Sequence, residues 1–129
     1  MFTIEQIVEA HSKVKSGVDF PKYIQQLKQL GVTDYETWVV DSHTGYFGEN
    51  KYQTTSDPLY EQLEIADTSN KEKFVEQLKI HQQGKTDYLT FCKGCAEAGI
   101  EKWFARLDMM TCTYYDKAGN EILVQQIPQ

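Results

Sequence analysis

The stretch GIEKWFARLDMMTCTYYDKAGNEILVQQI, residues 99–127, decides the fold class. Its first glycine can end a helix, and the following residues are rich in aromatic and β-branched side chains, which favour strands. A polar cluster at residues 116–120 interrupts the run and predicts a turn. The stretch therefore predicts strands over residues 103–107, 110–115 and 122–127, and the last two form a β-hairpin.

Two helices are predicted before this stretch, because apolar residues recur there at helical spacing. The first helix begins after Ser69 or Asn70, either of which can cap it. The second begins after Thr86 or Asp87 and ends at Gly99, since glycine readily adopts the left-handed conformation that closes a helix.

The N-terminal half predicts the same order of elements. Thr3 and Gln6 form a capping-box pattern at the start of one helix. Pro21 suits the first turn of a second helix, which Gly31 ends. Strands are then expected at residues 35–40, 46–47, 52–55 and 59–65.

The two halves align as an internal repeat, residues 3–56 and 69–127, at an offset of 67 and then 68 residues. The identical pairs are Glu5/Glu72, Val8/Val75, Glu9/Glu76, Gly17/Gly84 and Gly31/Gly99. Because the helices come in pairs, a parallel α/β fold is disfavoured. We expect a single domain, residues 1–129, with an α+β fold in which two helical hairpins pack on a mostly antiparallel sheet of about six strands.

The composition excludes several classes of protein. The 13 basic residues are scattered among 19 acidic ones and give a net charge of −6, which argues against a nucleic-acid partner. No apolar run reaches the roughly 18 residues of a membrane span, and the N-terminal residues do not resemble a signal peptide. Three cysteines, an odd number, suit a reducing compartment. We therefore expect a cytoplasmic protein without a membrane partner.

Cys92 and Cys95 form a CxxC motif, which allows three interpretations. The motif can be a redox pair, part of a zinc site, or a piece of the core. A zinc site would also need Cys112 and a histidine. The repeat alignment places the two cysteines at the apolar positions Ile24 and Leu27 of the sister helix, which favours the core. We expect no metal and no cofactor.

Polar residues near the strand ends are the candidate binding site. Asp41 and His43 share a face if their segment is extended, and a carboxylate can orient an imidazole as a general base. Asp41 and Asp108 each follow the first strand of their half, so they could face one another as an acid pair or cation site. The alternative is that each acid caps an exposed turn. The candidate set is Asp41, His43, Tyr46, Arg106, Asp108 and Tyr114.

Two further histidines, His11 and His81, lie on predicted helices beside apolar stripes. We interpret both as boundary residues of the core rather than as ligands. Aromatic residues concentrate in the predicted strands, and alternation cannot bury neighbours such as Tyr114 and Tyr115 on one face. Some aromatic side chains must therefore meet helices, and others must meet solvent, a second subunit or a ligand.

A spaced set of residues carries a family resemblance. The set comprises AGIEKW at residues 98–103, Asp108, Thr113-Tyr114, Asp116, Gly119 and Ile127-Pro128, after an opening hairpin with Gly31-Val32 and Tyr35. In these residues the chain resembles, over essentially its whole length, the YdfO/YbcV-like family of small bacterial and prophage-borne proteins. Some members carry the label "phage envelope protein". The resemblance implies an α+β fold and no known activity, and it supplies no catalytic residues.

Two functions from different classes follow. The favoured one is a non-enzymatic binding or interaction protein of prophage origin, acting through the exposed side of an aromatic sheet, with a homodimer as one outcome. The alternative is a small enzyme or small-ligand sensor with a pocket between the two repeats. A pocket predicts a concave site where polar groups from both halves converge, whereas an interaction surface predicts a flat, exposed aromatic patch.

Overall fold

The computed structural model describes residues 2–14 and 19–127. Gly17 and Pro128, which the sequence comparison used, lie outside these residues. The elements are α1 (Ile4–His11), α2 (Phe20–Leu30), β1 (Asp34–Trp38), β2 (Thr44–Phe47), the short 3₁₀ turn η2 (Glu49–Lys51), β3 (Gln53–Thr55), α3 (Lys71–Gln82), α4 (Tyr88–Glu97), β4 (Ile100–Arg106), β5 (Thr111–Asp116) and β6 (Glu121–Gln126).

The predicted α+β fold is confirmed: the described residues form four α-helices and one six-stranded antiparallel sheet. The strands lie in the order β3-β2-β1-β4-β5-β6, so each half of the chain supplies three neighbouring strands. The two halves meet where β1 pairs with β4, with Glu36 opposite Phe104 at the middle of the pairing. This central pair turns two three-stranded units into one continuous sheet.

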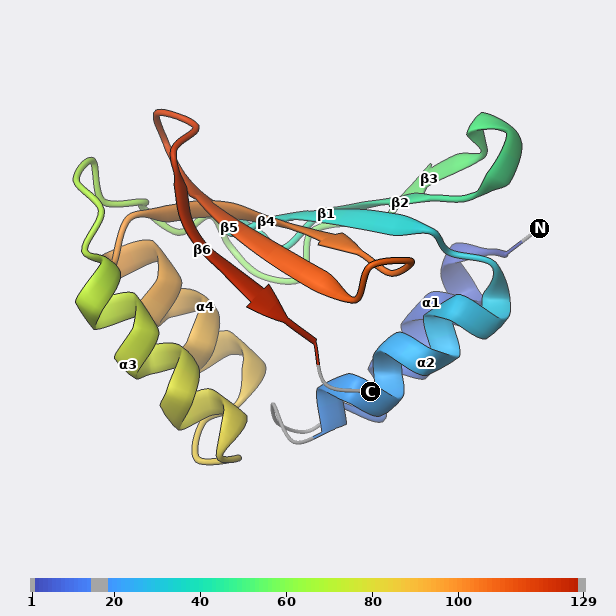
Figure 1. The fold of residues 1–129 in the computed structure, drawn as a ribbon, viewed down its shortest axis with the longest axis horizontal. Helices are drawn as coiled ribbons and strands as arrows, with labels where there is room; N and C mark the ends of the chain where they lie inside the picture. Colours follow the sequence, from blue (N-terminus) through green and yellow to red (C-terminus); the bar gives the residue numbers. More distant parts are fainter. Residues whose placement is uncertain (1, 15–18, 128–129) are drawn as a thin grey trace.

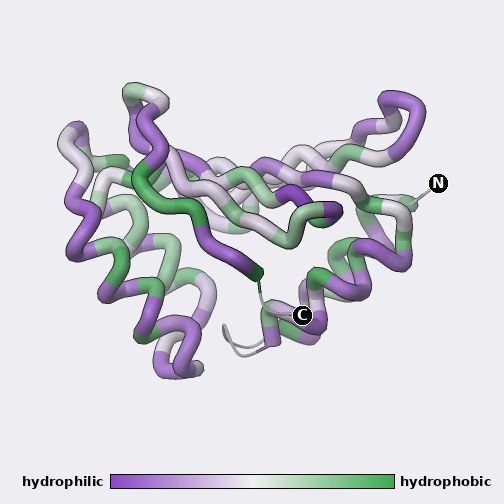
Figure 2. Tube along the Cα trace, viewed as in Figure 1, coloured by the Kyte–Doolittle hydropathy of each residue, from purple (hydrophilic) through white to green (hydrophobic). Residues whose placement is uncertain are grey.

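Both helical hairpins lie on the same face of the sheet (Figure 1). The hairpin of α1 and α2 covers one end of this face, and the hairpin of α3 and α4 covers the other. Apolar and polar residues alternate around the helices, as the banding in Figure 2 shows. The apolar sides pack toward the sheet, and the fully buried side chains there include Ile7, Ile24, Leu27, Phe74 and Ile100.

The helix ends follow the predicted caps. Thr3 and Gln6 form both hydrogen bonds of the capping box at α1. The side chain of Asn70 accepts from the N–H of Lys73 in α3, and Asp87 caps α4 in the same way. Side-chain oxygens thus satisfy backbone donors that would otherwise lack a partner in the first turn of α1, α3 and α4.

The β-hairpins β1–β2 and β4–β5 pair their strands in equivalent registers. Tyr35 lies opposite Tyr46 across β1 and β2, and Trp103 lies opposite Tyr114 across β4 and β5. Trp103 follows Tyr35, and Tyr114 follows Tyr46, by the same 68 positions. Their connecting turns also correspond, because Ser42 and Met110 both have a positive φ, of 66° and 52°. These correspondences agree with the alignment of residues 3–56 with residues 69–127. An origin of the chain by duplication stays a prediction.

The strand expected at residues 59–65 is wrong. The segment makes isolated hydrogen bonds instead of a ladder: the N–H of Leu59 donates to Asp41 O and the N–H of Leu63 to Val40 O. The hydroxyl of Tyr60 also donates to the carbonyl of Val39, at 2.6 Å. The segment is therefore held at the end of β1 as an irregular strap.

None of the helices in the described residues is long and apolar enough to cross a membrane.

Two left-handed glycines give a matched test of packing. Gly99 has a φ of +81°, and a Cβ added there would lie 2.7 Å from backbone atoms of Thr68 and Ser69. Gly119 has a φ of +85° with nothing within 4 Å of such a Cβ. We expect Gly119→Ala to lower the free energy of unfolding by about 1–2 kcal/mol, because alanine is strained in the left-handed conformation. Gly99→Ala should lower the free energy of unfolding in urea by clearly more than Gly119→Ala does, because the backbone atoms of Thr68 and Ser69 cannot move aside. Equal losses in the two variants would contradict the close packing at Gly99.

Candidate ligand pocket between the helical hairpins

A cavity of about 440 Å³ lies between the two helical hairpins and the inner face of the sheet. Side chains from both halves of the chain line it, including Ile7 and Tyr23 from the first hairpin and Leu78 and Phe91 from the second. Its volume is within the range of natural small-molecule sites, about 300–1,000 Å³. The seam between the halves is therefore hollow.

Four aromatic rings on the sheet line the floor of the cavity. Tyr35 and Tyr46 are register partners, with ring centroids 5.8 Å apart. Trp103 and Tyr114 are the equivalent partners in the other half, at 6.0 Å. All four side chains are buried because successive residues of a strand point to opposite faces, and these four share the inner one.

Two histidines stand on opposite hairpins. His11, near the end of α1, makes edge-on ring contacts with Tyr23 and Tyr88, each at 5.2 Å between centroids. His81, near the end of α3, stacks on Phe91 at 4.4 Å. Burial lowers the pKa of both imidazoles, and for His81 this outweighs an opposing hydrogen bond to the Thr86 backbone. Both rings are therefore neutral at pH 7.

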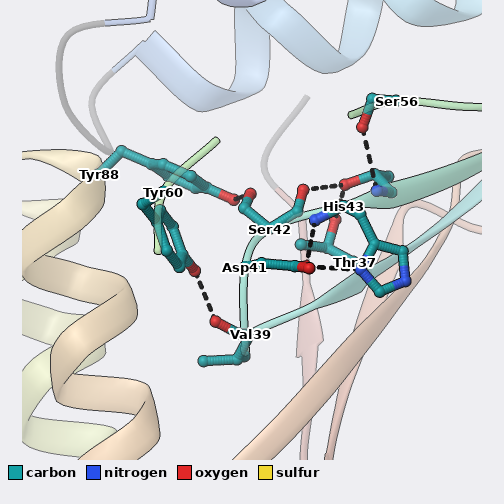
Figure 3. Close-up of polar contacts among 9 residues, drawn as sticks. Thr37, Val39, Asp41, Ser42, His43, Ser56, Tyr60 and Tyr88 are labelled. Carbon is teal, nitrogen blue, oxygen red and sulfur yellow. Dashed lines mark hydrogen bonds and ion pairs between the residues drawn. The ribbon is translucent and has the colours of Figure 1, made fainter. Parts of the chain in front are cut away.

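Hydroxyl groups pair with one another along the cavity wall. The Oγ of Ser42 lies 2.6 Å from the hydroxyl of Tyr88, which ties the β1–β2 turn to the start of α4 (Figure 3). The Oγ1 of Thr37 lies 2.9 Å from that of Thr44, which in turn donates to the carbonyl of Ser42. The Ser42–Tyr88 hydrogen bond thus connects the two halves of the chain at the cavity.

The lining is uncharged over the residues that the structure describes. It contains aromatic, aliphatic, hydroxyl, amide and thiol groups and the two imidazoles, but no Asp, Glu, Lys or Arg side chain. Burial raises the pKa of Tyr35 and Tyr114 well above the ordinary value, so these hydroxyls also stay neutral. The cavity is an apolar site with a few neutral hydrogen-bonding groups.

Two of the six candidate residues line this cavity, Tyr46 and Tyr114. Both lie on the inner face of the sheet and are buried. Of the two neighbouring tyrosines that cannot share a face, Tyr114 is thus the buried one, whereas Tyr115 is only partly buried. Alternation explains the difference, because Tyr115 takes the outward position next to it.

Asp41 and His43 come together, but outside the cavity lining. The Nδ1 of His43 lies 2.5 Å from Oδ1 of Asp41, and the backbone N–H of His43 donates to the same oxygen at 3.0 Å (Figure 3). Burial raises the pKa of Asp41, but these hydrogen bonds outweigh it and lower the pKa overall. The ring of His43 stacks on Trp38, an outward residue of β1.

Arg106 and Asp108 lie at the exposed β4–β5 turn, where Nη2 and Oδ2 are 3.4 Å apart. Asp108 also accepts from the N–H of Met109, so it caps this turn. Asp41 and Asp108 do not form an acid pair. Because β1 and β4 run antiparallel, the residues after each strand lie at opposite ends of the central pair.

The outer face of the sheet carries the other aromatic residues. Trp38 and Tyr115 are half-buried there, and the ammonium group of Lys102 lies over both rings, at 4.8 and 5.4 Å. Lys102 also pairs with Glu36 at 3.1 Å. Charged side chains therefore cover part of these rings, and the outer face is not a simple apolar patch.

The core interpretation of the CxxC motif is confirmed. Cys92 and Cys95 are fully buried in the hydrophobic core, and Cys112 is 1% exposed on the inner face of β5. Burial raises the pKa of Cys92 to about 11 and that of Cys112 to about 12. Thiols of this kind are protonated at pH 7 and are poor nucleophiles.

Sequence reasoning missed the residues that enclose the cavity, above all His11, His81 and Tyr88. The sequence predicts only boundary positions of the core for the two histidines, and it singles out no role for Tyr88. The signal that could have found them is the repeat itself. It pairs Tyr35 with Trp103 as inward residues and points to the seam between the halves.

Together, the fold and the cavity define an α+β protein in which two helical hairpins enclose an uncharged pocket above an antiparallel sheet. A family model described as "Protein of unknown function (DUF1398)" matches residues 8–126, and the chain belongs to this family. No curated protein matches the chain.

The hydrogen bond between Ser42 and Tyr88 should contribute measurably to stability. We expect Ser42→Ala and Tyr88→Phe each to lower the free energy of unfolding, measured in urea, by about 1 kcal/mol. The double variant should cost less than the sum, because the second change removes a group that has already lost its partner. Tyr88→Phe combined with Ser69→Ala is the control, because Ser69 contacts Asp116 rather than this network, and the two effects should add. Additivity in the first pair would argue against the hydrogen bond.

Stability should fall on mild acidification because of the buried histidines. The pKa of His11 is lowered by folding, so the unfolded chain takes up protons first as the pH falls through about 6.5. The contribution of His11 to the free energy of unfolding is therefore fully present above this pH. It is lost as the pH falls further, by at most about 1.4 kcal/mol per pH unit for one histidine. His11→Phe keeps the ring contacts and cannot protonate. It should lose less stability than the wild type between pH 7.5 and 5.5, and an equal loss would contradict the burial of His11.

Proposed function

We propose that this protein binds a small, uncharged, ring-bearing organic molecule in the cavity between its helical hairpins. The observation that carries the proposal is the cavity of about 440 Å³, which is lined by side chains from both halves. Natural small-molecule sites combine this kind of mostly apolar, aromatic lining with a few polar groups. The floor of Tyr35, Tyr46, Trp103 and Tyr114 offers ring surfaces against which a flat molecule can pack.

The absence of charge in the described lining favours a neutral ligand. An ionised ligand would leave water without a counter-ion, which costs several kcal/mol. A cation packed against aromatic rings recovers only about 0.5–2 kcal/mol. The desolvation cost is larger, so the cavity selects against both anions and cations.

A binding role is favoured over catalysis because the carboxylate–imidazole pair of Asp41 and His43 lies outside the cavity lining. The cavity also favours a ligand over a protein partner, since it is concave and receives polar groups from both halves. This is the outcome that a pocket, rather than a flat interaction surface, predicts. A homodimer through the outer sheet face, a cytoplasmic location, and the prophage origin implied by the YdfO/YbcV-like resemblance stay predictions.

Two dyes with the same rings test the proposal. N-phenyl-1-naphthylamine is uncharged, and 8-anilino-1-naphthalenesulfonate adds one sulfonate to the same skeleton. We expect saturable fluorescence enhancement with the neutral dye at about one molecule per chain. The sulfonate should bind at least tenfold more weakly, because the described lining of the cavity contains no charged side chain to act as its counter-ion. Absence of saturable binding by the neutral dye, or equal affinities, would contradict the proposal.

Neighbouring residues of β6 provide the matched control. Gln125 lines the cavity, whereas Val124 is 54% exposed on the other face of the same strand. Gln125→Trp should fill part of the cavity and weaken binding of the neutral dye about tenfold. Val124→Trp adds the same ring to the outer face and should leave the affinity unchanged. Equal effects of the two variants would place the dye elsewhere on the protein.

A further inference from the structure

One histidine of the cavity lining, His81, has a ring nitrogen with a fixed role in hydrogen bonding. His81 stacks flat on Phe91, with 14° between the ring planes, so the edge of its imidazole is oriented by this contact. Its Nδ1 lies 3.1 Å from the carbonyl oxygen of Thr86 and 2.9 Å from the hydroxyl of the same residue. The ring is therefore held on two sides, by a stacking contact and by hydrogen bonds.

The Thr86 carbonyl determines which nitrogen of His81 carries the hydrogen. A carbonyl oxygen can only accept, so Nδ1 is the N–H donor. The other nitrogen, Nε2, then carries a lone pair and is an acceptor. Among the described residues, no group donates a hydrogen bond to Nε2. A residue of the cavity lining thus presents an acceptor that lacks a partner.

The surroundings of His81 keep this acceptor available at neutral pH. Burial lowers the pKa of the ring, while the hydrogen bond with Thr86 and the negative charge of Asp87 act in the opposite direction. Phe91 and Thr86, which contact the ring, are uncharged. Asp87 at the start of α4 is therefore the charged group that acts on it within the described part of the chain.

We infer that Nε2 of His81 accepts a hydrogen bond from an N–H or O–H group of the bound molecule. The ligand class is then narrower than under the proposed function, on which this inference rests. It is an uncharged ring compound that carries a hydrogen-bond donor, such as an aromatic amine, a phenol or a nitrogen heterocycle with an N–H. Such a donor satisfies the unpaired acceptor, whereas a ligand without one would leave it buried and unpaired.

His11 provides the comparison within the same cavity. Its ring makes contacts with Tyr23 and Tyr88, but no described group forms a hydrogen bond with either ring nitrogen. Nothing therefore selects which of its nitrogens carries the hydrogen. The same substitution, His→Phe, can be made at both positions, and only His81 is expected to discriminate between ligands by their donor.

The experiment compares N-phenyl-1-naphthylamine with its N-methyl derivative, which has the same rings and no N–H. In the wild type the N-methyl dye should bind about threefold to tenfold more weakly, the loss expected for one hydrogen bond. In His81→Phe the two dyes should bind equally well, because the acceptor is gone. In His11→Phe the preference for the N–H dye should persist. Circular dichroism checks that each variant is folded.

The comparison of two dyes separates recognition from structural damage. A structural defect in His81→Phe would weaken both dyes alike and leave their ratio unchanged. The inference is overturned if the wild type shows no preference, if the preference survives in His81→Phe, or if only His11→Phe abolishes it. Failure of the N–H dye to bind at all would instead refute the proposed function.

A pH titration of the wild type gives a second measurement that needs no variant. Burial lowers the pKa of His81, so the ring is titrated by NMR alongside the dyes. Protonation of Nε2 removes the acceptor, while the diarylamine nitrogen of the dye stays uncharged. The affinity ratio of the two dyes should therefore approach one as the His81 ring protonates, with the protein still folded by circular dichroism. A ratio that stays constant while NMR shows the ring becoming protonated would overturn the inference.

Discussion

The antiparallel pairing of β1 with β4 is the constraint on which the rest of the structure depends. It joins two three-stranded units edge to edge, so that their inward faces become one surface. Both helical hairpins must then cover the same side, where the apolar residues are. They sit at opposite ends of this surface. The part of the sheet between them forms the floor of the cavity and carries Tyr35, Tyr46, Trp103 and Tyr114.

The cavity brings together groups that are costly to bury alone. Hydroxyl pairs such as Ser42 with Tyr88 offset that cost locally, since each supplies the other's partner. The two imidazoles instead lose their charge, because burial lowers the pKa of His11 and His81. The result is a neutral interior in which hydrogen bonding, rather than charge, can distinguish one ligand from another.

Local signals in the sequence predicted most of the fold. Caps, helix-ending glycines and strand composition placed the elements correctly, because each depends on a few neighbouring residues. The strand expected at residues 59–65 failed for the opposite reason. Its apolar residues suit a strand, but a strand needs a partner edge, and here the backbone bonds singly to the end of β1. Of the candidate site, Tyr46 and Tyr114 line the cavity, while Arg106 and Asp108 pair with each other at the exposed β4–β5 turn.

The sequence by itself determined the α+β class and, apart from the strand expected at residues 59–65, the order of elements, because alternation and helical spacing are properties of the local chain. The alignment of the two halves also favoured the burial of Cys92 and Cys95. Only the tertiary structure decided where the site lies. Asp41 and Asp108 had equivalent positions in the two halves, yet antiparallel pairing sends them to opposite ends of the sheet. The same pairing brings His11 and His81 from different helical hairpins to one cavity, a proximity that no spacing along the chain encodes.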